Sequence, residues 1–118
     1  MRSLPKAIMG GVKIELPADY DLFKASILDD QHDDDQGVYE VWWAANTRYP
    51  ELALSSRLAI AESVVSVLLS EGMVRLVRGE WTGPESERDL VEDPSAALLD
   101  WATWTLPPGE PVVWMTRP

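Results

Sequence analysis

The stretch that decides the fold is residues 54–79, LSSRLAIAESVVSVLLSEGMVRLVRG. Apolar side chains recur along its first part at the spacing of one helical face. They are Leu58, Ala61, Val65, Leu68 and Leu69, with Val64 at the edge. Gly72 suits the left-handed residue that ends a helix, and the apolar and basic segment at 73–78 predicts a strand. We therefore expect a helix from Leu54 or Ser55 to Glu71, then a strand.

Two shorter helices are predicted before this stretch. Apolar residues recur at helical spacing from residue 20 to about residue 28, and Asp19 can cap that helix. The second helix covers residues 38–48, and Asp35 or Gln36 lies near its start. Its adjacent Trp42 and Trp43 lie about 100° apart around the axis. One of these two indoles must therefore face outward.

Two segments of the chain are strongly acidic. Residues 29–35 contain five aspartates and no apolar side chain, so we expect a solvated loop that continues to Gly37. Residues 80–93 contain six acids, one cation and the pair Gly83-Pro84, which predicts a second acidic loop.

A fourth helix and a final strand complete the expected elements. Asp93 or Ser95 can cap a helix that runs to about Thr105, and residues 107–109, Pro-Pro-Gly, then turn the chain. Residues 112–116 have the composition of a strand, whose antiparallel mate is the strand at 73–78. At the other end of the chain, alternation over Val12 to Leu16 predicts a short lead-in strand.

Length and charge limit the organisation of the molecule. The 118 residues fit one domain, and 46% of them are apolar, so the chain can bury an ordinary core. We expect a flexible N-terminal arm over residues 1–13 and one globular domain over 14–118. The arm holds three of the ten cations and none of the 20 acids. The acidic domain that remains should repel phosphate backbones and attract basic proteins.

Composition also limits the compartment and the covalent chemistry. The chain has no cysteine, and hence neither a disulfide nor a thiolate zinc site. The longest hydrophobic run, residues 64–69, is interrupted by Ser66 and is too short to span a bilayer. We expect a cytoplasmic protein that makes no use of a membrane.

Catalytic and metal-binding patterns are missing as well. The aspartates around His32 offer oxygen ligands to a hard cation, but the position of Gly37 does not fit an EF-hand loop. His32 is the only histidine, and the aspartates beside it would hold it charged rather than tuned to act as a base. Residues 10–11, Gly-Gly, lack the spacing of a phosphate-binding loop. We expect no enzyme activity, no metal and no cofactor.

The order of the predicted elements resembles that of a winged helix-turn-helix domain. The likeness covers residues 20 to 117 and rests on a helix, a helix, a third helix ended by Gly72, and then wing strands. It implies an α+β, mostly helical fold in which three to four helices pack on a two-stranded antiparallel wing. One departure is the connection from Gly79 to Pro111, which exceeds a simple wing loop and contains the predicted fourth helix.

The third helix lacks the side chains with which DNA-binding members of this fold read bases. Arg57 is its one cation, and it stands beside Glu62 and Glu71. The face expected to be exposed holds serine and alanine: Ser56, Ala59, Ser63, Ser66 and Ser70. We therefore do not expect direct binding to nucleic acid.

The remaining signals are those of a protein-binding module. Acidic groups steer association with a basic protein, and a few aromatic side chains anchor it. The residues expected to bind the partner are Asp29, Asp30, Asp33, Asp34, Asp35, Trp43, Trp81, Glu85, Glu87 and Asp89. The most concrete form of this hypothesis is an immunity-type or antitoxin-like inhibitor that covers the basic surface of a cognate toxin enzyme.

Two other functions stay open. A winged-helix transcriptional regulator would contact phosphates through Arg57, Arg75 and Arg78, although we expect Arg75 and Arg78 to pair with the nearby Glu80 and Glu92. A phage-type DNA mimic would share the acidic surface and differ from an inhibitor in capturing a DNA-binding protein.

Overall fold

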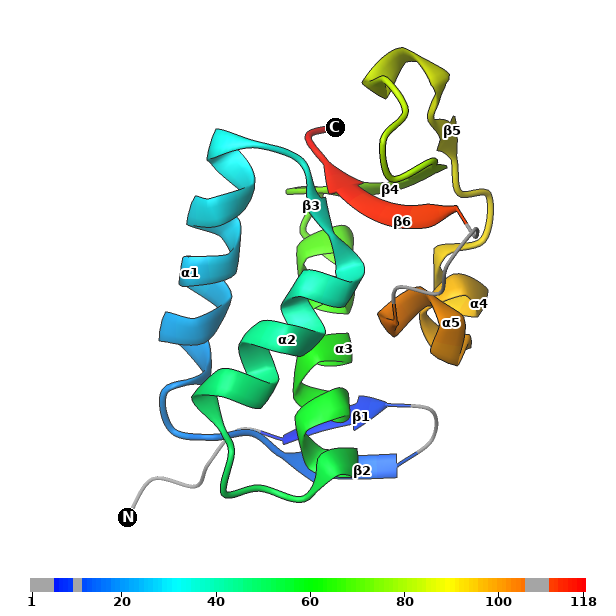
Figure 1. Ribbon diagram of the computed structural model, residues 1–118. Coiled ribbons are helices and arrows are strands. Elements are labelled where there is room, and N and C mark those ends of the chain that lie inside the picture. The colour runs from blue at the N-terminus through cyan, green and yellow to red at the C-terminus, as the bar shows by residue number, and fades with distance from the viewer. Residues whose placement is uncertain (1–5, 10–11, 106–110) are drawn as a thin grey trace.

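Three helices pack on one face of a four-stranded antiparallel sheet in the computed structural model, which describes residues 6–9, 12–105 and 111–118 (Figure 1). The helices are α1 (Tyr20–Asp33), α2 (Val38–Arg48) and α3 (Leu54–Ser70). The sheet has the order β3-β6-β4-β5, so the α+β class is confirmed. The sheet has four strands, however, and not the two that were expected.

Helix α3 forms the centre of the core. Of its predicted stripe, Ala61, Val64, Val65 and Leu68 are buried, whereas Leu58 and Leu69 are only partly buried and Ile60 was not predicted. Its buried face consists of Ile60, Ala61, Ser63, Val64, Val65 and Leu68. The helix ends in a Schellman motif: Gly72 has φ of 70°, its N–H donates to the carbonyl of Leu69, and the N–H of Met73 donates to the carbonyl of Leu68. The predicted role of Gly72 is therefore confirmed.

The face of α3 that was expected to be exposed is mostly not so: Ser70 is exposed, Ser56, Ala59 and Ser66 are partly buried, and Ser63 is buried. Ser63 is 2% exposed, and its hydroxyl forms a 2.9 Å hydrogen bond with the phenol of Tyr20 in α1. This bond satisfies two polar groups inside the core, which is the condition for burying a serine there.

The central strands are β4 (Arg75–Gly79) and β6 (Val112–Thr116). They pair antiparallel as predicted, with Leu76 opposite Met115 and Val77 opposite Trp114. Leu76 and Met115 join the core beneath the helices, whereas Val77 and Trp114 belong to a separate buried cluster. Because side chains alternate along a strand, this second cluster lies on the opposite face of the sheet.

Two edge strands were not foreseen. β3 (Gln36–Gly37) pairs with β6, and β5 (Asp89–Leu90) pairs with β4. Each is two residues long. Both lie in segments that were predicted as acidic loops, and a 3-10 turn, η1 (Glu85–Glu87), also interrupts the second of them.

The expectation of a solvated loop from residue 29 to Gly37 is wrong. Helix α1 continues through residues 29–33, and Gln31, one turn beyond Ile27, is 2% exposed. The exposed Asp29 and Asp30 come directly before that buried position. Packing of one helical face is sufficient to extend the helix, although aspartate has a poor helix propensity.

The predicted fourth helix is two short helices. α4 (Pro94–Leu99) is capped by Asp93, as expected, whose Oδ1 accepts from the N–H of Ala96. Asp100 adopts an extended conformation and caps α5 (Trp101–Trp104) by accepting from the N–H of Ala102. An aspartate in mid-segment competes for backbone donors, which explains the break.

Asp19 stands at the N-cap position of α1 but makes no capping hydrogen bond. Its Oδ1 accepts from the hydroxyl of Tyr49 at 2.9 Å, and its Oδ2 accepts from Nε of Arg48 at 3.0 Å. Instead of capping α1, Asp19 therefore links the start of α1 to the end of α2.

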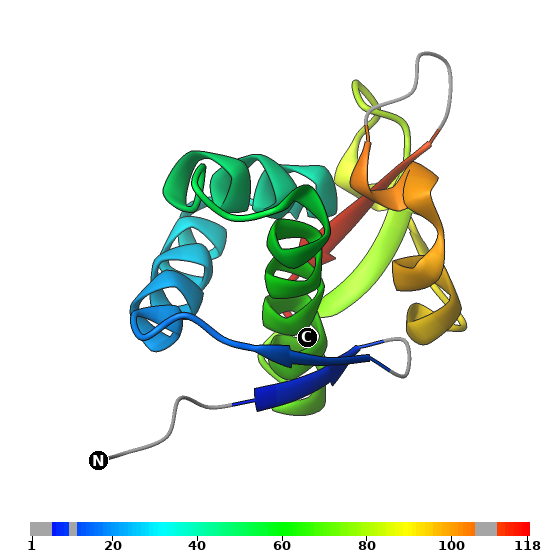
Figure 2. The same ribbon diagram turned by 90° about the horizontal axis from the view of Figure 1, so that it is seen from below.

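An N-terminal hairpin lies beside α3 and consists of β1 (Lys6–Met9) and β2 (Val12–Glu15) (Figures 1 and 2). β2 matches the predicted lead-in strand, whereas β1 falls within the segment expected to be a flexible arm. Residues 1–5 and 10–11 of that segment, and the predicted turn at 107–109, lie outside the described residues. No helix in the described part of the chain is both long and apolar enough to cross a membrane.

Candidate functional site

Tyr39, in the first turn of α2, joins the two tryptophans that were expected to face outward. Its ring centroid lies 4.8 Å from that of Trp43 and 5.8 Å from that of Trp81. Tyr39 is only 2% exposed, whereas Trp43 and Trp81 are each 53% exposed. The exposure of both indoles agrees with the sequence-based expectation, and a buried ring supports each of them.

Gly37 makes room for that ring. A Cβ atom at this position would stand far inside van der Waals contact with Cε1 of Tyr39. Gly37 lies in β3, opposite Trp114 of β6. A glycine at the edge of the sheet therefore allows the tyrosine to cover it.

Trp114 extends the cluster of rings across the outer face of the sheet. Trp81 stacks on it with a centroid distance of 6.0 Å and an interplanar angle of 22°. The guanidinium carbon of Arg88 lies 4.1 Å from the same ring centroid. We call Tyr39, Trp43, Trp81 and Trp114 the aromatic platform.

The guanidinium group of Arg88 makes two contacts. Besides its contact with Trp114, its Nη1 donates to Oδ2 of Asp35 at 2.7 Å. The two side chains are only 10% and 15% exposed. Asp35, which was predicted to bind a partner, is thus engaged inside the molecule, and this contact holds the two acidic segments together.

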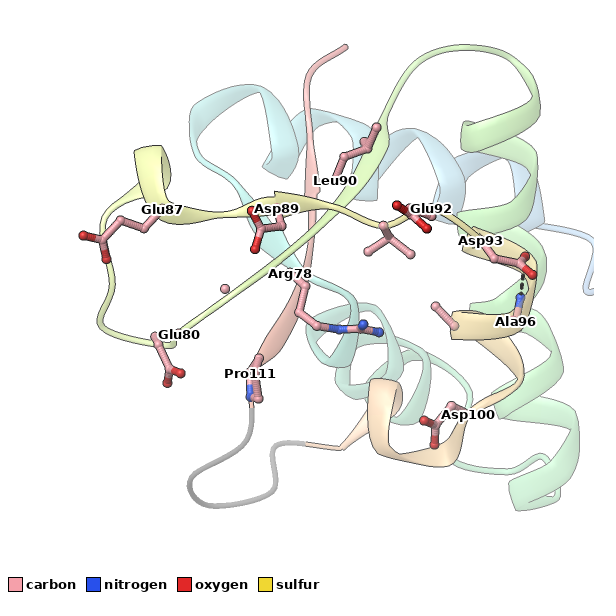
Figure 3. A pocket seen from close by; sticks show the side chains of 13 residues that line it. Arg78, Glu80, Glu87, Asp89, Leu90, Glu92, Asp93, Ala96, Asp100 and Pro111 are labelled. Carbon is pink, nitrogen blue, oxygen red and sulfur yellow. Dashed lines mark hydrogen bonds between the residues drawn. The ribbon is translucent and has the colours of Figure 1, made fainter.

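A second feature, an acidic groove, opens where β4 and β5 face α4 and α5 (Figure 3). Its volume is about 690 Å³. Six carboxylate residues line it: Glu80, Glu87, Asp89, Glu92, Asp93 and Asp100. Arg78 is the one cation in the lining, and its side chain extends across the middle of the groove (Figure 3).

Arg78 does not neutralise these carboxylates by direct contact. Neither Arg78 nor Arg75 forms an ion pair with any residue that the structure describes. The expectation that Arg75 and Arg78 pair with Glu80 and Glu92 is therefore wrong. In the described part of the chain, Glu80 and Glu92 line the groove but form no ion pair with either arginine. The excess of negative charge is left open to solvent.

The groove and the platform share one segment of the chain. Glu80 lines the groove, and the next residue, Trp81, belongs to the platform. Glu87 and Asp89 line the groove, and Arg88 between them turns to Trp114. Residues 80–89 therefore present a charged side and an aromatic side.

The other predicted partner-binding residues are more dispersed. Asp29, Asp30 and Asp34 are exposed around the C-terminal end of α1, and Glu85 is exposed in η1 without lining the groove. The side chain of Asp33 lies outside the described residues, as does that of His32. Of the predicted set, the groove brings together Glu87 and Asp89, and the platform brings together Trp43 and Trp81.

Arg57, named for the DNA-binding alternative, is partly buried at the start of α3, and its Nε has no hydrogen-bond partner among the described residues. Arg75 and Arg78 are exposed in β4. The three arginines thus come from two different elements.

Sequence reasoning missed Tyr39, Arg88 and Trp114 as parts of the site. A signal for Arg88 was available, because it is the single cation among the six acids of residues 80–93. Such a cation is a natural internal partner for a nearby carboxylate. No comparable local signal identifies Tyr39 or Trp114, since their role depends on contacts across the sheet.

The one titratable group of the platform is the phenol of Tyr39. Burial, together with the negative charge of Glu40, raises the pKa of Tyr39 to about 12, so its phenol stays protonated at neutral pH. Among the described residues, no three histidine, aspartate or glutamate side chains converge as metal ligands. Stacking on exposed rings and attraction of cations are the interactions that the surface offers.

No protein-family model matches the chain, and neither a curated protein nor a solved structure matches it.

Proposed function

We propose that this chain is a non-enzymatic, acidic protein-binding module that covers a basic surface of another protein. In its most concrete form it is an immunity-type or antitoxin-like inhibitor of a toxin enzyme. The observation that supports this proposal best is that residues 80–89 contribute to both the acidic groove and the aromatic platform.

Charge supports the choice of a basic partner. The chain has a formal net charge of −10, and the six carboxylates of the groove stand against a single guanidinium. Complementary charge accelerates association and excludes partners of the wrong sign. A toxin enzyme that acts on nucleic acid has a basic substrate surface, which is the kind of surface that these carboxylates would cover.

The platform supplies the anchors that charge alone does not provide. Trp43 and Trp81 are exposed, yet both pack on Tyr39. Rings that are already held in place lose little conformational entropy on binding. Tryptophans in such positions commonly contribute most of the binding free energy of an interface.

The experiment is capture of partners from the native host with the tagged protein, followed by titration of any captured enzyme. We expect one basic protein in stoichiometric amount, whose activity falls to zero near a one-to-one ratio. Trp43→Ala and Trp81→Ala should weaken the inhibition, whereas Trp101→Ala, at an indole of similar exposure outside the platform, should not. Absence of a stoichiometric partner, or equal effects of the three substitutions, would show that the proposal is wrong.

A winged-helix-like arrangement, with a regulator of transcription as the second candidate function, has its own support. Three helices precede the antiparallel pair of β4 and β6, and Arg75 and Arg78 are exposed on β4. A gel shift with random duplex DNA at low salt tests this function, because phosphate binding weakens steeply as salt rises. A shift that disappears with salt and with Arg75→Ala plus Arg78→Ala would favour it over inhibition.

A DNA mimic would be recognised in the same capture experiment by its partner, a DNA-binding protein rather than an enzyme. Cytoplasmic location is part of the proposal, and it rests on the lack of cysteine in the sequence.

A further inference from the structure

The molecule already contains one arginine recognised by a tryptophan and a carboxylate. The guanidinium of Arg88 lies 4.1 Å from the ring centroid of Trp114, and its Nη1 donates a hydrogen bond of 2.7 Å to Oδ2 of Asp35. This arrangement combines stacking on the face of an indole with a charge-assisted hydrogen bond. Both interactions favour a planar guanidinium over an ammonium group.

Trp81 offers the same chemistry toward solvent. It stacks on Trp114 in a nearly parallel orientation, with 22° between the planes, and Tyr39 contacts it at a tilt of 52°. With 53% of the residue still exposed, the stacked indole retains an open surface. Its neighbour Glu80 is exposed and lines the acidic groove.

We propose that Trp81 is the docking point for an arginine side chain of the partner, which stacks on the indole while other basic residues of the partner reach around residues 80–89 into the acidic groove. This inference rests on the proposed function, and it specifies which side chain of a basic protein the platform selects. The partner would therefore present an arginine, rather than a lysine, at the centre of its contact with the platform.

Other occupants fit this surface less well. A second copy of the chain would bring another net charge of −10 against the carboxylates of the groove, and like charges facing each other oppose association. The same repulsion applies to the phosphates of a nucleic acid. A basic protein is the macromolecule whose charge complements the surface beside Trp81.

The preference can be measured on the full chain with two short peptides at low salt, one of alternating arginine and glycine and one of alternating lysine and glycine. An exposed cation–π contact is worth about 0.5–1 kcal/mol, so we expect the arginine peptide to bind roughly two- to fivefold more tightly. Trp81→Leu should remove this difference, because it should lower the affinity for the arginine peptide more than the affinity for the lysine peptide. Trp101→Leu is the matched control, since Trp101 is 51% exposed and contacts Trp42 instead.

Two further measurements keep the inference testable if Trp81→Leu does not fold. Trp81→Phe keeps an aromatic face and should retain part of the preference for arginine. In the unaltered protein, the indole N–H resonance assigned to Trp81 should shift with the arginine peptide more than that of Trp101. Equal affinity for both peptides, or an unchanged preference in folded Trp81→Leu, overturns the inference.

The groove is tested separately by Glu87→Lys combined with Asp89→Lys. If this variant loses affinity for both peptides while the native chain binds both equally, the acidic surface binds cations and only the role of Trp81 is wrong. If neither peptide binds the native chain at low salt, the electrostatic basis of the proposed function fails together with the inference.

Discussion

Asp35 and Arg88 form an ion pair of 2.7 Å between positions that are 53 residues apart. Asp35 lies just before β3, and Arg88 lies between η1 and β5. The pair therefore fastens the segment that bears Trp81, Glu87 and Asp89 to the junction of α1 and α2. The geometry of the candidate site depends on this contact.

Arg88→Met should destabilise the protein by about 2–3 kcal/mol, because it leaves the carboxylate of Asp35 without its partner in a mostly buried position. Urea unfolding followed by tryptophan fluorescence measures the change. Arg75→Met is the control: Arg75 is exposed and makes no ion pair with a described residue, so its replacement should stay within about 0.5 kcal/mol. Equal losses in the two variants would contradict the structural role of Arg88.

Gly37→Ala should cost about 1–3 kcal/mol, since the added methyl group would collide with the ring of Tyr39. The backbone itself accepts alanine, because φ is −66° and ψ is 141° at this position. In a Tyr39→Ala background the same substitution should therefore be nearly neutral. Thermal unfolding of the four proteins in this double-mutant cycle tests the coupling, and additive effects would exclude it.

Gln31→Met should stabilise the protein by about 1 kcal/mol. The side chain of Gln31 is 2% exposed, and neither of its amide atoms has a hydrogen-bond partner among the described residues. A buried polar group without a partner costs more than an apolar one of similar shape. Thr103→Val gives the opposite control, because the Thr103 hydroxyl donates to the carbonyl of Ala97 at 2.6 Å and its loss should destabilise. A lower melting temperature for Gln31→Met would contradict the prediction.

Glu62 should make the protein less stable as pH rises. Burial raises the pKa of this carboxyl above its ordinary value of 4.5, so the folded state binds the proton more tightly than the unfolded chain. Its contribution is fully present below 4.5 and is lost as pH rises through the raised value. Glu62→Gln should therefore raise the melting temperature at neutral pH and have little effect in acid. A melting temperature unchanged at neutral pH would count against this cause.

Asp19 should show the reverse dependence. Burial opposes its ionisation, but the hydrogen bonds from Tyr49 and Arg48 and the charge of Arg48 outweigh burial and lower the pKa below 3.8. The stability that Asp19 contributes is present above 3.8 and is lost as pH falls through the lowered value. Asp19→Asn should thus destabilise at neutral pH and converge with the native chain in strong acid. Parallel melting curves over the whole range would refute it.

The elements that the sequence predicts well are those specified by local pattern. The range of α2 follows from apolar spacing and from Pro50, since the residue before a proline avoids the helical region, and the end of α3 follows from Gly72. By contrast, two-residue strands such as β3 and β5 have no periodicity of their own. They exist because β6 and β4 offer free hydrogen-bonding edges at those places, which only the folded chain determines.

The same distinction separates the predicted from the unpredicted parts of the site. The angle between Trp42 and Trp43 around one helix predicts that one of the two indoles faces outward, and the structure shows that it is Trp43. The contacts of Tyr39 with Trp43 and Trp81 cannot be predicted in this way, because the contact with Trp81 depends on the pairing of β4 with β6. Likewise the sequence identifies Asp35 as part of an acidic segment but not as the ion-pair partner of Arg88, because Arg88 is far away along the chain.

The two short outer strands also influence how the protein behaves at high concentration. A sheet recruits further strands through long unpaired edges, and here each edge is two residues long, with Asp89 on one of them. The four-stranded sheet therefore offers almost no template for edge-to-edge stacking into fibres.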